Sequence, residues 1–350
     1  MEQKKALIAM SGGVDSSVAA YLAGRAGFSC IGATMQLHPG DTSGQILDAR
    51  SVAERLGIPF YEWDFRKEFR QHVMDAFVRS YENGLTPNPC VVCNRHLKFG
   101  HFMDKATELG CSHVVTGHYA RIKQDISTGC WMLQKAVDET KDQSYFLYSL
   151  TQGQLSRILF PLGDLTKAEV REIAAEQGFL TAKKKDSQDI CFVPDGDYMS
   201  FMTHYTGKTY PGGDFLNSFG NVVGQHKGAV GYTIGQRKGL GLAMGEPVYV
   251  CGKDMEKNTV TVGPNEALFS RTLLANDWFW HTIPVLTSPL HVCAKTRSRM
   301  TEQPATVYPE EDGFARVVFD QPQRAITPGQ AVVLYDGDIV VGGGTITEVL

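Results

Sequence analysis

The sequence has no apolar run long enough to cross a lipid bilayer. Its residues are 43% hydrophobic and 21% charged, and no stretch approaches the roughly 20 consecutive apolar residues of a transmembrane helix. The first five residues, MEQKK, lead directly into an apolar segment, so we expect no signal peptide. These absences predict a cytoplasmic protein without a membrane partner.

The sequence also lacks an excess of positive charge. Its 34 Lys and Arg residues face 38 Asp and Glu residues, which gives a formal net charge of −4. This balance is not typical of a general nucleic-acid binder, so any such site has to be a local patch. Internal repeats and low-complexity tracts are absent as well.

The cysteines lack the spacing of a disulfide framework or a paired zinc site. There are eight, irregularly spaced, and the one C-x-x-C pair is formed by Cys90 and Cys93. A zinc site built from such pairs needs a second pair. The cysteines therefore indicate thiol chemistry or another metal centre.

The first half of the chain alternates short apolar runs with segments of helical periodicity, which is typical of parallel strands connected by helices. Glycines at 27, 57 and 110 follow helical segments and mark their ends. We predict strands at 5–10, 30–37, 59–64 and 113–117, and helices at 16–27, 46–56, 67–82 and 96–109. Residues 120–123 and 131–135 flank a predicted hairpin tip, and a capping box begins another helix at Thr166.

After about residue 195 glycine becomes frequent and helical periodicity fades. At 350 residues, two or three domains are expected. We predict an α/β domain over 1–197, a small Gly-rich β module over 198–267 and a β-barrel-like domain over 268–350. Strands are predicted at 247–252, 259–263, 291–296, 315–320 and 331–335, and Asp336-Gly337 indicates a tight hairpin.

A small-residue loop, SGGVDSS, follows the first predicted strand at residues 11–17. Its glycines let backbone N–H groups approach an anion, and the following helix start adds partial positive charge. It lacks the lysine of a Walker A loop, which argues against γ-phosphate hydrolysis. It resembles the pyrophosphate loop of enzymes that split ATP into AMP and pyrophosphate, although an ordinary strand-to-helix turn is the alternative.

Two further segments present thiols. Cys90 and Cys93 follow two prolines in TPNPCVVCN, where the prolines stiffen the backbone. A helix start favours the thiolate, which makes Cys93 a candidate nucleophile, with a zinc half-site or a redox pair as alternatives. Cys191 follows the basic run 183–185, which we expect to lower its pKa. The alternative is a buried cysteine in a strand over 190–193.

Six segments occur in an order that resembles the tRNA-specific 2-thiouridylase (MnmA) family over essentially the whole chain. They are residues 11–17, 88–94, 116–120, 141–147, 186–193 and 231–241. The resemblance implies a pyrophosphate-loop domain, which is adenine nucleotide alpha hydrolase-like and Rossmann-like. It also implies ATP-dependent 2-thiolation of the wobble uridine of tRNA. In that reaction the base oxygen is adenylated and a cysteine persulfide supplies sulfur, forming 2-thiouridine, AMP and pyrophosphate.

The resemblance implies roles for particular residues. Cys93 corresponds to a nucleophile, and Cys191 to the cysteine that carries the persulfide and then forms a transient disulfide with Cys93. Magnesium is expected to arrive with ATP, held mainly by phosphates and water rather than by a protein metal site. The expected ATP contacts are Ala9, Met10, Ser11, Gly12, Gly13, Val14, Asp15, Ser16, Met35 and Gly117.

The expected contacts to tRNA or its flipped base are Asn88, Pro89, Cys90, His118, Lys141, Asp142, Gln143, Arg297, Ser298 and Gln330. The β module and the C-terminal domain are expected to contact tRNA as well. Lys295, Arg297 and Arg299 alternate along a predicted strand and form a phosphate-contacting ridge on one face. Some family members carry aspartate at the position of Cys90, and more often an aromatic residue at the position of Ser298.

The resemblance also implies partners. A cysteine desulfurase or a sulfur-relay protein is expected to load the persulfide, and a thiol reductant to reset the cysteine pair. Three alternatives stay open: an iron–sulfur cluster on Cys90, Cys93 and Cys191; another pyrophosphate-loop adenylating enzyme; and a nucleotide-regulated RNA-binding protein without catalysis.

Overall fold

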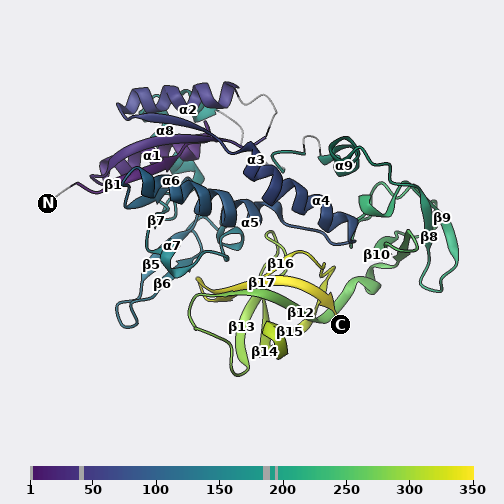
Figure 1. Cartoon of the computed structure of the whole chain (residues 1–350). Helices are drawn as coiled ribbons and strands as arrows, with labels where there is room; N and C mark the ends of the chain where they lie inside the picture. Colours follow the sequence, from purple (N-terminus) through teal and green to yellow (C-terminus); the bar gives the residue numbers. More distant parts are fainter. Residues whose placement is uncertain (1–2, 39–42, 184–189, 194–195) are drawn as a thin grey trace.

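Three β-sheets organise the chain, as the computed structural model shows (Figure 1). The structure describes residues 3–38, 43–183, 190–193 and 196–350. Within these ranges no helix has the length and hydrophobicity that crossing a membrane requires. The first sheet carries the predicted nucleotide loop.

The first sheet is parallel and has the strand order β3-β2-β1-β4-β7. For four of its strands, the observed ends lie within two residues of the predicted ends. The fifth, β7, was not predicted. The strands are β1 (Lys5–Ala9), β2 (Ser29–Gln36), β3 (Phe60–Asp64), β4 (His113–Val115) and β7 (Ile158–Leu159).

Helices cover both faces of this sheet because its strands alternate their side chains between two apolar clusters. Ile8 and Val115 pack with α1 (Val14–Arg25), α2 (Ser43–Leu56) and α8 (Lys167–Glu176). Leu7 and Val114 pack on the other face with the helices of residues 66–82 and 89–108. Those helices are α3 (Arg66–Phe69), α4 (Asp75–Glu82), α5 (Pro89–Cys93) and α6 (Phe102–Glu108), with π-helical segments at Arg70–Met74 and Asn94–His101.

The predicted hairpin is confirmed as β5 (Arg121–Gln124) and β6 (Trp131–Gln134). It does not join the parallel sheet. Instead β6 pairs with the last strand of the chain at Ile339. A short helix, α7 (Gln152–Leu155), follows it, and the predicted capping box at Thr166 begins α8.

The middle of the chain forms a four-stranded sheet of order β10-β11-β8-β9. It is preceded by α9 (Tyr198–Thr206), and its strands are β8 (Gly213–Leu216), β9 (Val222–His226), β10 (Tyr249–Asp254) and β11 (Thr259–Gly263). Short 3-10 helices occur at Ser144–Phe146, Leu180–Lys183, Ala229–Gly231, Asn265–Leu268 and Glu311–Gly313.

The last part is a closed antiparallel barrel, as predicted. Its strands follow the order β12-β15-β14-β13-β16-β17, and pairing of β12 with β17 closes it. The turn at Asp336-Gly337 joins β16 to β17, which confirms that hairpin. The strands are β12 (Phe269–Trp280), β13 (Leu290–Lys295), β14 (Gln303–Pro309), β15 (Ala315–Arg324), β16 (Ala331–Asp336) and β17 (Ile339–Val349).

Candidate functional site

The nucleotide loop connects β1 to α1 at the carboxyl end of the parallel sheet. Ala9 ends β1, residues 10–13 form the loop, and Val14 begins α1, two residues earlier than predicted. Gly13 takes the extended N-cap conformation, which allows this earlier start. At Gly12 φ is +71°, and a Cβ there would lie 2.2 Å from the carbonyl oxygen of Gln45. Glycine is therefore required at this position.

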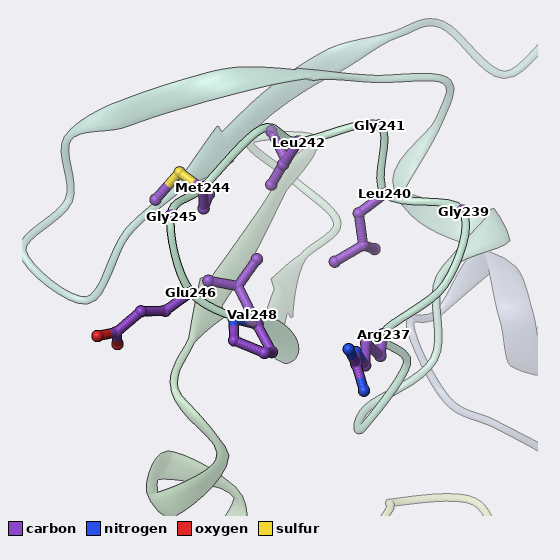
Figure 2. Close-up of a pocket in the computed structure, with 10 residues that line it drawn as sticks. Arg237, Gly239, Leu240, Gly241, Leu242, Met244, Gly245, Glu246 and Val248 are labelled. Carbon is purple, nitrogen blue, oxygen red and sulfur yellow. The ribbon is translucent and has the colours of Figure 1, made fainter.

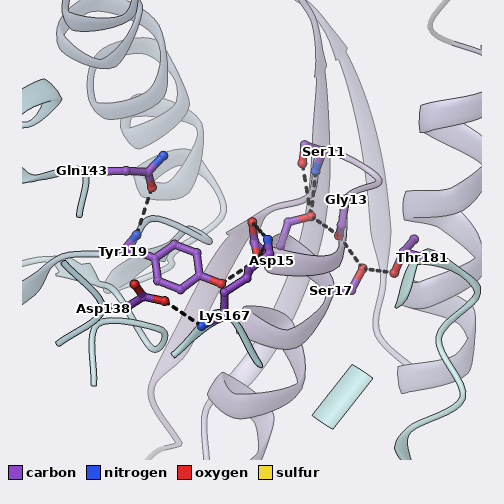
Figure 3. Close-up of polar contacts among 10 residues, drawn as sticks. Ser11, Gly13, Asp15, Ser17, Tyr119, Asp138, Gln143, Lys167 and Thr181 are labelled. Atoms are coloured by element: carbon purple, nitrogen blue, oxygen red, sulfur yellow. Dashed lines mark hydrogen bonds and ion pairs between the residues drawn. The ribbon is translucent and has the colours of Figure 1, made fainter. Parts of the chain in front are cut away.

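Serine hydroxyl groups stabilise the loop by hydrogen bonds to its backbone (Figure 3). Ser16 Oγ accepts the backbone N–H of Ser11 at 3.2 Å, and Ser17 Oγ donates to the carbonyl of Gly13 at 2.8 Å. These bonds connect the loop to the first turn of α1.

Asp15 is held by two groups that the sequence analysis did not assign to the site (Figure 3). Lys167 Nζ lies 2.7 and 2.8 Å from the two carboxylate oxygens of Asp15, and Tyr119 Oη donates to one of them at 2.9 Å. Lys167 is the first residue of α8, and 152 residues separate it from Asp15. The capping box predicted this helix start, but no sequence pattern indicates that its lysine reaches the loop.

Gly117 lies directly against the loop. A Cβ on Gly117 would stand 2.7 Å from the carbonyl carbon of Asp15 and 2.8 Å from Ser16 N. Met35 lies near the end of β2, half-buried and paired in register with Trp63. The residues predicted to bind ATP therefore gather at the carboxyl ends of β1, β2 and β4, where the strand order reverses and ligands of such sheets bind.

The cysteines lie at the start of a continuous helical run. Asn88 is its N-cap and Pro89 its first residue; Cys90 is exposed, and Cys93 is buried with 8% of its surface accessible. Cys191 is exposed in a turn closed by Val193 N and the carbonyl of Ile190. The alternative of a strand over 190–193 is therefore wrong. Residues 186–189 of the family segment, and Lys184 and Lys185, lie outside the described residues.

The three thiols lie in the same region of the structure, near enough to influence one another electrostatically. Cys93 interacts electrostatically with both Cys90 and Cys191, and all three interact with Lys98. Lys98 lies in the π-helical segment after Cys93 and was not predicted as a site residue. Every cysteine of the chain is a free thiol.

The prediction of lowered thiol pKa values is wrong for this state. Burial raises the pKa of Cys93 to about 12, and the neighbouring thiols raise it further, while Lys98 opposes them. The pKa of Cys90 and of Cys191 is raised as well, because surrounding protein atoms reduce the hydration of each thiol although both residues keep exposed surface. Loss of solvation outweighs the helix start and the nearby cation, so the thiols are protonated at neutral pH.

The iron–sulfur alternative does not fit the observed arrangement. The described residues include all three cysteines, yet they contain no group of three His, Cys, Asp or Glu side chains placed to hold a metal ion. No step of the chemistry below is routed through a cluster.

Three residues predicted to contact tRNA make internal hydrogen bonds. Gln143 bonds the backbone of Tyr119 through both its own N–H and its side-chain oxygen. Asp142 accepts the backbone N–H of Ala136 and the hydroxyl of Ser144. Nδ1 of His118 hydrogen-bonds Oγ1 of Thr116 at 2.7 Å, the ring packs between Phe99 and Phe160, and burial lowers its pKa well below the usual range. Lys141 lies in the same segment.

The predicted basic strand ends early. β13 stops at Lys295, so Arg297, Ser298 and Arg299 lie in the following turn, and the alternating ridge is wrong. Arg297 donates to the carbonyl oxygens of Ile234 and Ala325 and to Thr327 Oγ1. It therefore ties the middle part of the chain to the barrel.

Gln330 connects the barrel to the cysteine loop. Its side-chain N–H donates to the carbonyls of Thr86 at 2.8 Å and Pro87 at 3.2 Å. The backbone N–H of Thr86 bonds the carbonyl of Pro328 at 2.9 Å. The barrel thus fixes the backbone just before Asn88.

A surface pocket of about 470 Å³ lies in the loop that connects β9 to β10 (Figure 2). Arg237 and Glu246 are its charged lining residues, and the others are glycines and apolar side chains. None of the residues predicted to bind ATP or carry sulfur lines it.

A parallel sheet with an SGGxDSS loop at its switch point, joined to a closed barrel, defines a pyrophosphate-loop protein with appended β domains. Family models agree: a tRNA methyl transferase HUP domain matches residues 4–195, a tRNA methyl transferase PRC-barrel domain 199–264, and an aminomethyltransferase beta-barrel domain 270–346.

Curated relatives match over nearly the full length. The chain is 48% identical to the tRNA-specific 2-thiouridylase MnmA of Clostridioides difficile, covering 99% of each chain. It is 49% identical to the protein of the same name from Symbiobacterium thermophilum, covering 99% of this chain and 93% of that one. The chain belongs to the tRNA-specific 2-thiouridylase MnmA family. A solved 4-thiouridine synthetase–RNA complex with bound ATP has 19% identity and a TM-score of 0.36, covering 54% of this chain and 44% of that one.

Proposed function

We propose that this protein is an ATP-dependent tRNA-uridine 2-sulfurtransferase that converts the wobble uridine to 2-thiouridine. The observation that carries the proposal is the gathering of Cys93 and Cys191, distant in sequence, into one thiol cluster. Full-length relatives named tRNA-specific 2-thiouridylase support the same reaction. The pyrophosphate loop supplies the activating half of the site.

In the activation step, O2 of the uridine attacks the α-phosphorus of ATP, and the bond to pyrophosphate breaks. The backbone N–H groups of Gly12 and Gly13 and the start of α1 would face the phosphates. Lys167 supplies the side-chain cation that the loop itself lacks, and Asp15 orients it. Magnesium bound with the nucleotide would further offset phosphate charge.

In the sulfur step, the terminal sulfur of a Cys191 persulfide attacks C2, and AMP leaves with the former O2. The thiolate of Cys93 then attacks Sγ of Cys191, which forms a Cys93–Cys191 disulfide and leaves the terminal sulfur on C2. An external dithiol restores both cysteines by supplying two electrons and two protons. A cysteine desulfurase or a relay protein supplies the persulfide sulfur.

The tRNA reaches this site from the side of the β module and the barrel in our proposal. Asn88, Pro89 and Cys90 meet the flipped base, because chemistry at C2 requires a base taken out of the anticodon stack. The rigid Thr86–Pro87 backbone, held by Gln330, supports that contact. The turn at Arg297 and Ser298 adds contacts outside the site.

The test is single-turnover thiolation with protein persulfidated at Cys191 and purified without iron. We expect one 2-thiouridine per active site, with AMP and pyrophosphate formed in equal amount. Cys93→Ser and Cys191→Ser should each abolish the product, whereas Cys130→Ser, in the β5–β6 hairpin, should not. A thiocytidine product, or activity retained by either serine variant, would contradict the proposal.

A further inference from the structure

Lys98 is a half-buried cation beside the thiols that no described group neutralises. It lies in the π-helical segment Asn94–His101. Within the described ranges its ammonium makes no hydrogen bond or ion pair. It interacts electrostatically with Cys90, Cys93, Cys191 and His118. All four are uncharged at neutral pH in this state, so Lys98 faces no anion among them.

Three other lysines with little exposed side chain are paired, whereas the buried Nζ of Lys253 has no hydrogen-bond partner among the described residues. The side chains of Lys135 and Lys295 are 14% and 13% exposed, and both bond to Glu302. Lys167 is 11% exposed and bonds to Asp15. Partial desolvation of an ammonium without a counter-ion is unfavourable, and an anion formed beside it would offset that cost. The groups around Lys98 are those in which sulfur chemistry creates anions.

The position of Lys98 also depends on a local departure from regular helix. A π-helical segment separates α5, which ends at Cys93, from α6, which begins at Phe102. Such insertions change which side chains share a face and are frequent at functional sites. Here the insertion accompanies a lysine that interacts with thiols from two distant segments.

We propose that Lys98 is a positioning residue that holds the anionic sulfur formed at Cys93 or at the Cys191 persulfide. The proposal rests on the proposed function for the identity of the reaction. A persulfide anion and a Cys93 thiolate in one cluster repel each other, and one shared cation offsets that repulsion. Lys98 takes no part in bond making; it raises the population of the reactive anions.

The first test needs no tRNA. Iodoacetamide alkylation of each cysteine is followed by mass spectrometry from pH 7 to 10.5 in the unmodified protein, Lys98→Met, Lys98→Arg and Lys105→Met. Lys105 is the control because it lies on the same helical run and is also half-buried, but is paired with Glu108. The groups that interact electrostatically with Cys93 are Lys98, Cys90 and Cys191, and of these Lys98 is the cation. Loss of Lys98 should therefore move the pH profile of Cys93 alkylation to higher pH.

We expect Lys98→Met to slow alkylation of Cys93 and Cys191 at pH 8 by about three- to tenfold, which is up to one pKa unit. Lys98→Arg should stay within about twofold of the unmodified protein, because it keeps the charge, and Lys105→Met should be unchanged. Equal rates in Lys98→Met and the unmodified protein, or equal slowing in Lys105→Met, would overturn the proposal. Melting curves identify a misfolded variant, in which case Lys98→Gln replaces Lys98→Met.

The second test is single-turnover thiolation with preloaded persulfide. Lys98→Met should lower the rate of sulfur transfer at least as much as it lowers alkylation, with AMP formation less affected. If the alkylation shift is present but the unmodified protein thiolates no tRNA, the proposed function fails and the role of Lys98 stands. If thiolation is normal in Lys98→Met, the role of Lys98 fails and the proposed function stands.

Discussion

At the scale of single residues, Asp15 and Lys167 form the charged pair of the nucleotide loop. A Walker A loop carries its phosphate-binding lysine within the motif, and this loop has none. Lys167 reaches the same region from the first turn of α8, and both of its bonds to Asp15 are shorter than 3 Å. The carboxylate of Asp15 therefore holds this ammonium beside the loop, where in our proposal it meets the outer phosphates of ATP.

Replacing Lys167 should weaken binding of the outer phosphates of ATP and leave binding of the adenosine part unchanged. We predict that Lys167→Met weakens binding of a non-hydrolysable ATP analogue by about tenfold or more, the scale of one charge-assisted contact. Binding of AMP should change little, because the missing contact is to the outer phosphates. Isothermal titration calorimetry measures both. Lys135→Met is the control, since Lys135 is similarly buried and paired but lies in the strand-to-barrel junction. Equal weakening of AMP and the analogue would indicate a purely structural role.

The lowered pKa of His118 makes the free energy of unfolding depend on pH. Its pKa is well below the usual range because burial disfavours the imidazolium and Lys98 repels it. The unfolded chain therefore binds a proton as pH falls through about 6.5 while the folded chain does not. The contribution of His118 to the free energy of unfolding is therefore fully present above about pH 6.5 and decreases as the pH is lowered further. We predict that the melting temperature of His118→Gln falls less between pH 7.5 and 5.5 than that of the unmodified protein. His204→Gln, at an exposed site, should show the same fall as the unmodified protein.

At the scale of elements, the loop before the thiols is shaped by the barrel. Gly329 has φ of +90°, and a Cβ there would lie 2.9 Å from both Leu85 Cβ and Thr86 N. This close approach lets Gln330 and Pro328 bond the loop backbone. The prolines stiffen the segment, but these contacts from the barrel determine where it lies.

Removing the side chain of Gln330 should loosen this loop. Gln330→Ala leaves the carbonyls of Thr86 and Pro87 without that donor, which should destabilise the loop by about 1 kcal/mol. We predict several-fold faster hydrogen–deuterium exchange in peptides covering 84–92 in the free protein. Gln323→Ala removes a part-buried side-chain bond within the barrel, to the carbonyl of Gln321 at 2.7 Å, and should leave those peptides unchanged. Unchanged exchange in Gln330→Ala would show that the prolines alone hold the loop.

Elements defined by local patterns could be predicted from the sequence. Four of the five strands of the parallel sheet, the capping box at Thr166 and the Asp336-Gly337 hairpin depend on neighbouring residues, and all of these are present. The SGGVDSS loop was likewise located, because its glycines and hydroxyls are consecutive. The first helix was predicted two residues late, since Gly13 serves as the N-cap without a side chain.

Features that depend on distant contacts could not be predicted. The β5–β6 hairpin was recognised, but its pairing with β17 depends on which sheet edge is nearby in the fold. Lys167 and Lys98 belong to helices whose local pattern says nothing about Asp15 or the thiols. The predicted direction of the thiol pKa was wrong because burial is a tertiary property, and it outweighed the local helix start at Cys93.

At the scale of the whole molecule, one hydrophobic cluster joins the α/β part to the barrel, while the barrel interior around Phe319 forms a cluster of its own. The cluster that contains Phe77 and Phe99 of the helical layer also contains Tyr335 and Val340 of the barrel. Tyr145 Oη donates to the carbonyl of Ala331 at 2.9 Å. The apolar cluster of the middle sheet, centred on Phe215, is separate. We therefore expect the α/β part and the barrel to lose structure together.

Two truncations of buried aromatic residues distinguish these cores. Tyr335→Ala should destabilise the protein by about 3–5 kcal/mol, the usual range for deleting a buried aromatic side chain. In hydrogen exchange at rising urea, β16–β17 and residues 145–150 should then lose protection at the same concentration. Phe215→Ala should expose residues 213–226 first and leave those two segments protected. If residues 145–150 stayed protected after the barrel had opened in Tyr335→Ala, the shared core would not be cooperative, and the barrel would fold as an independent unit.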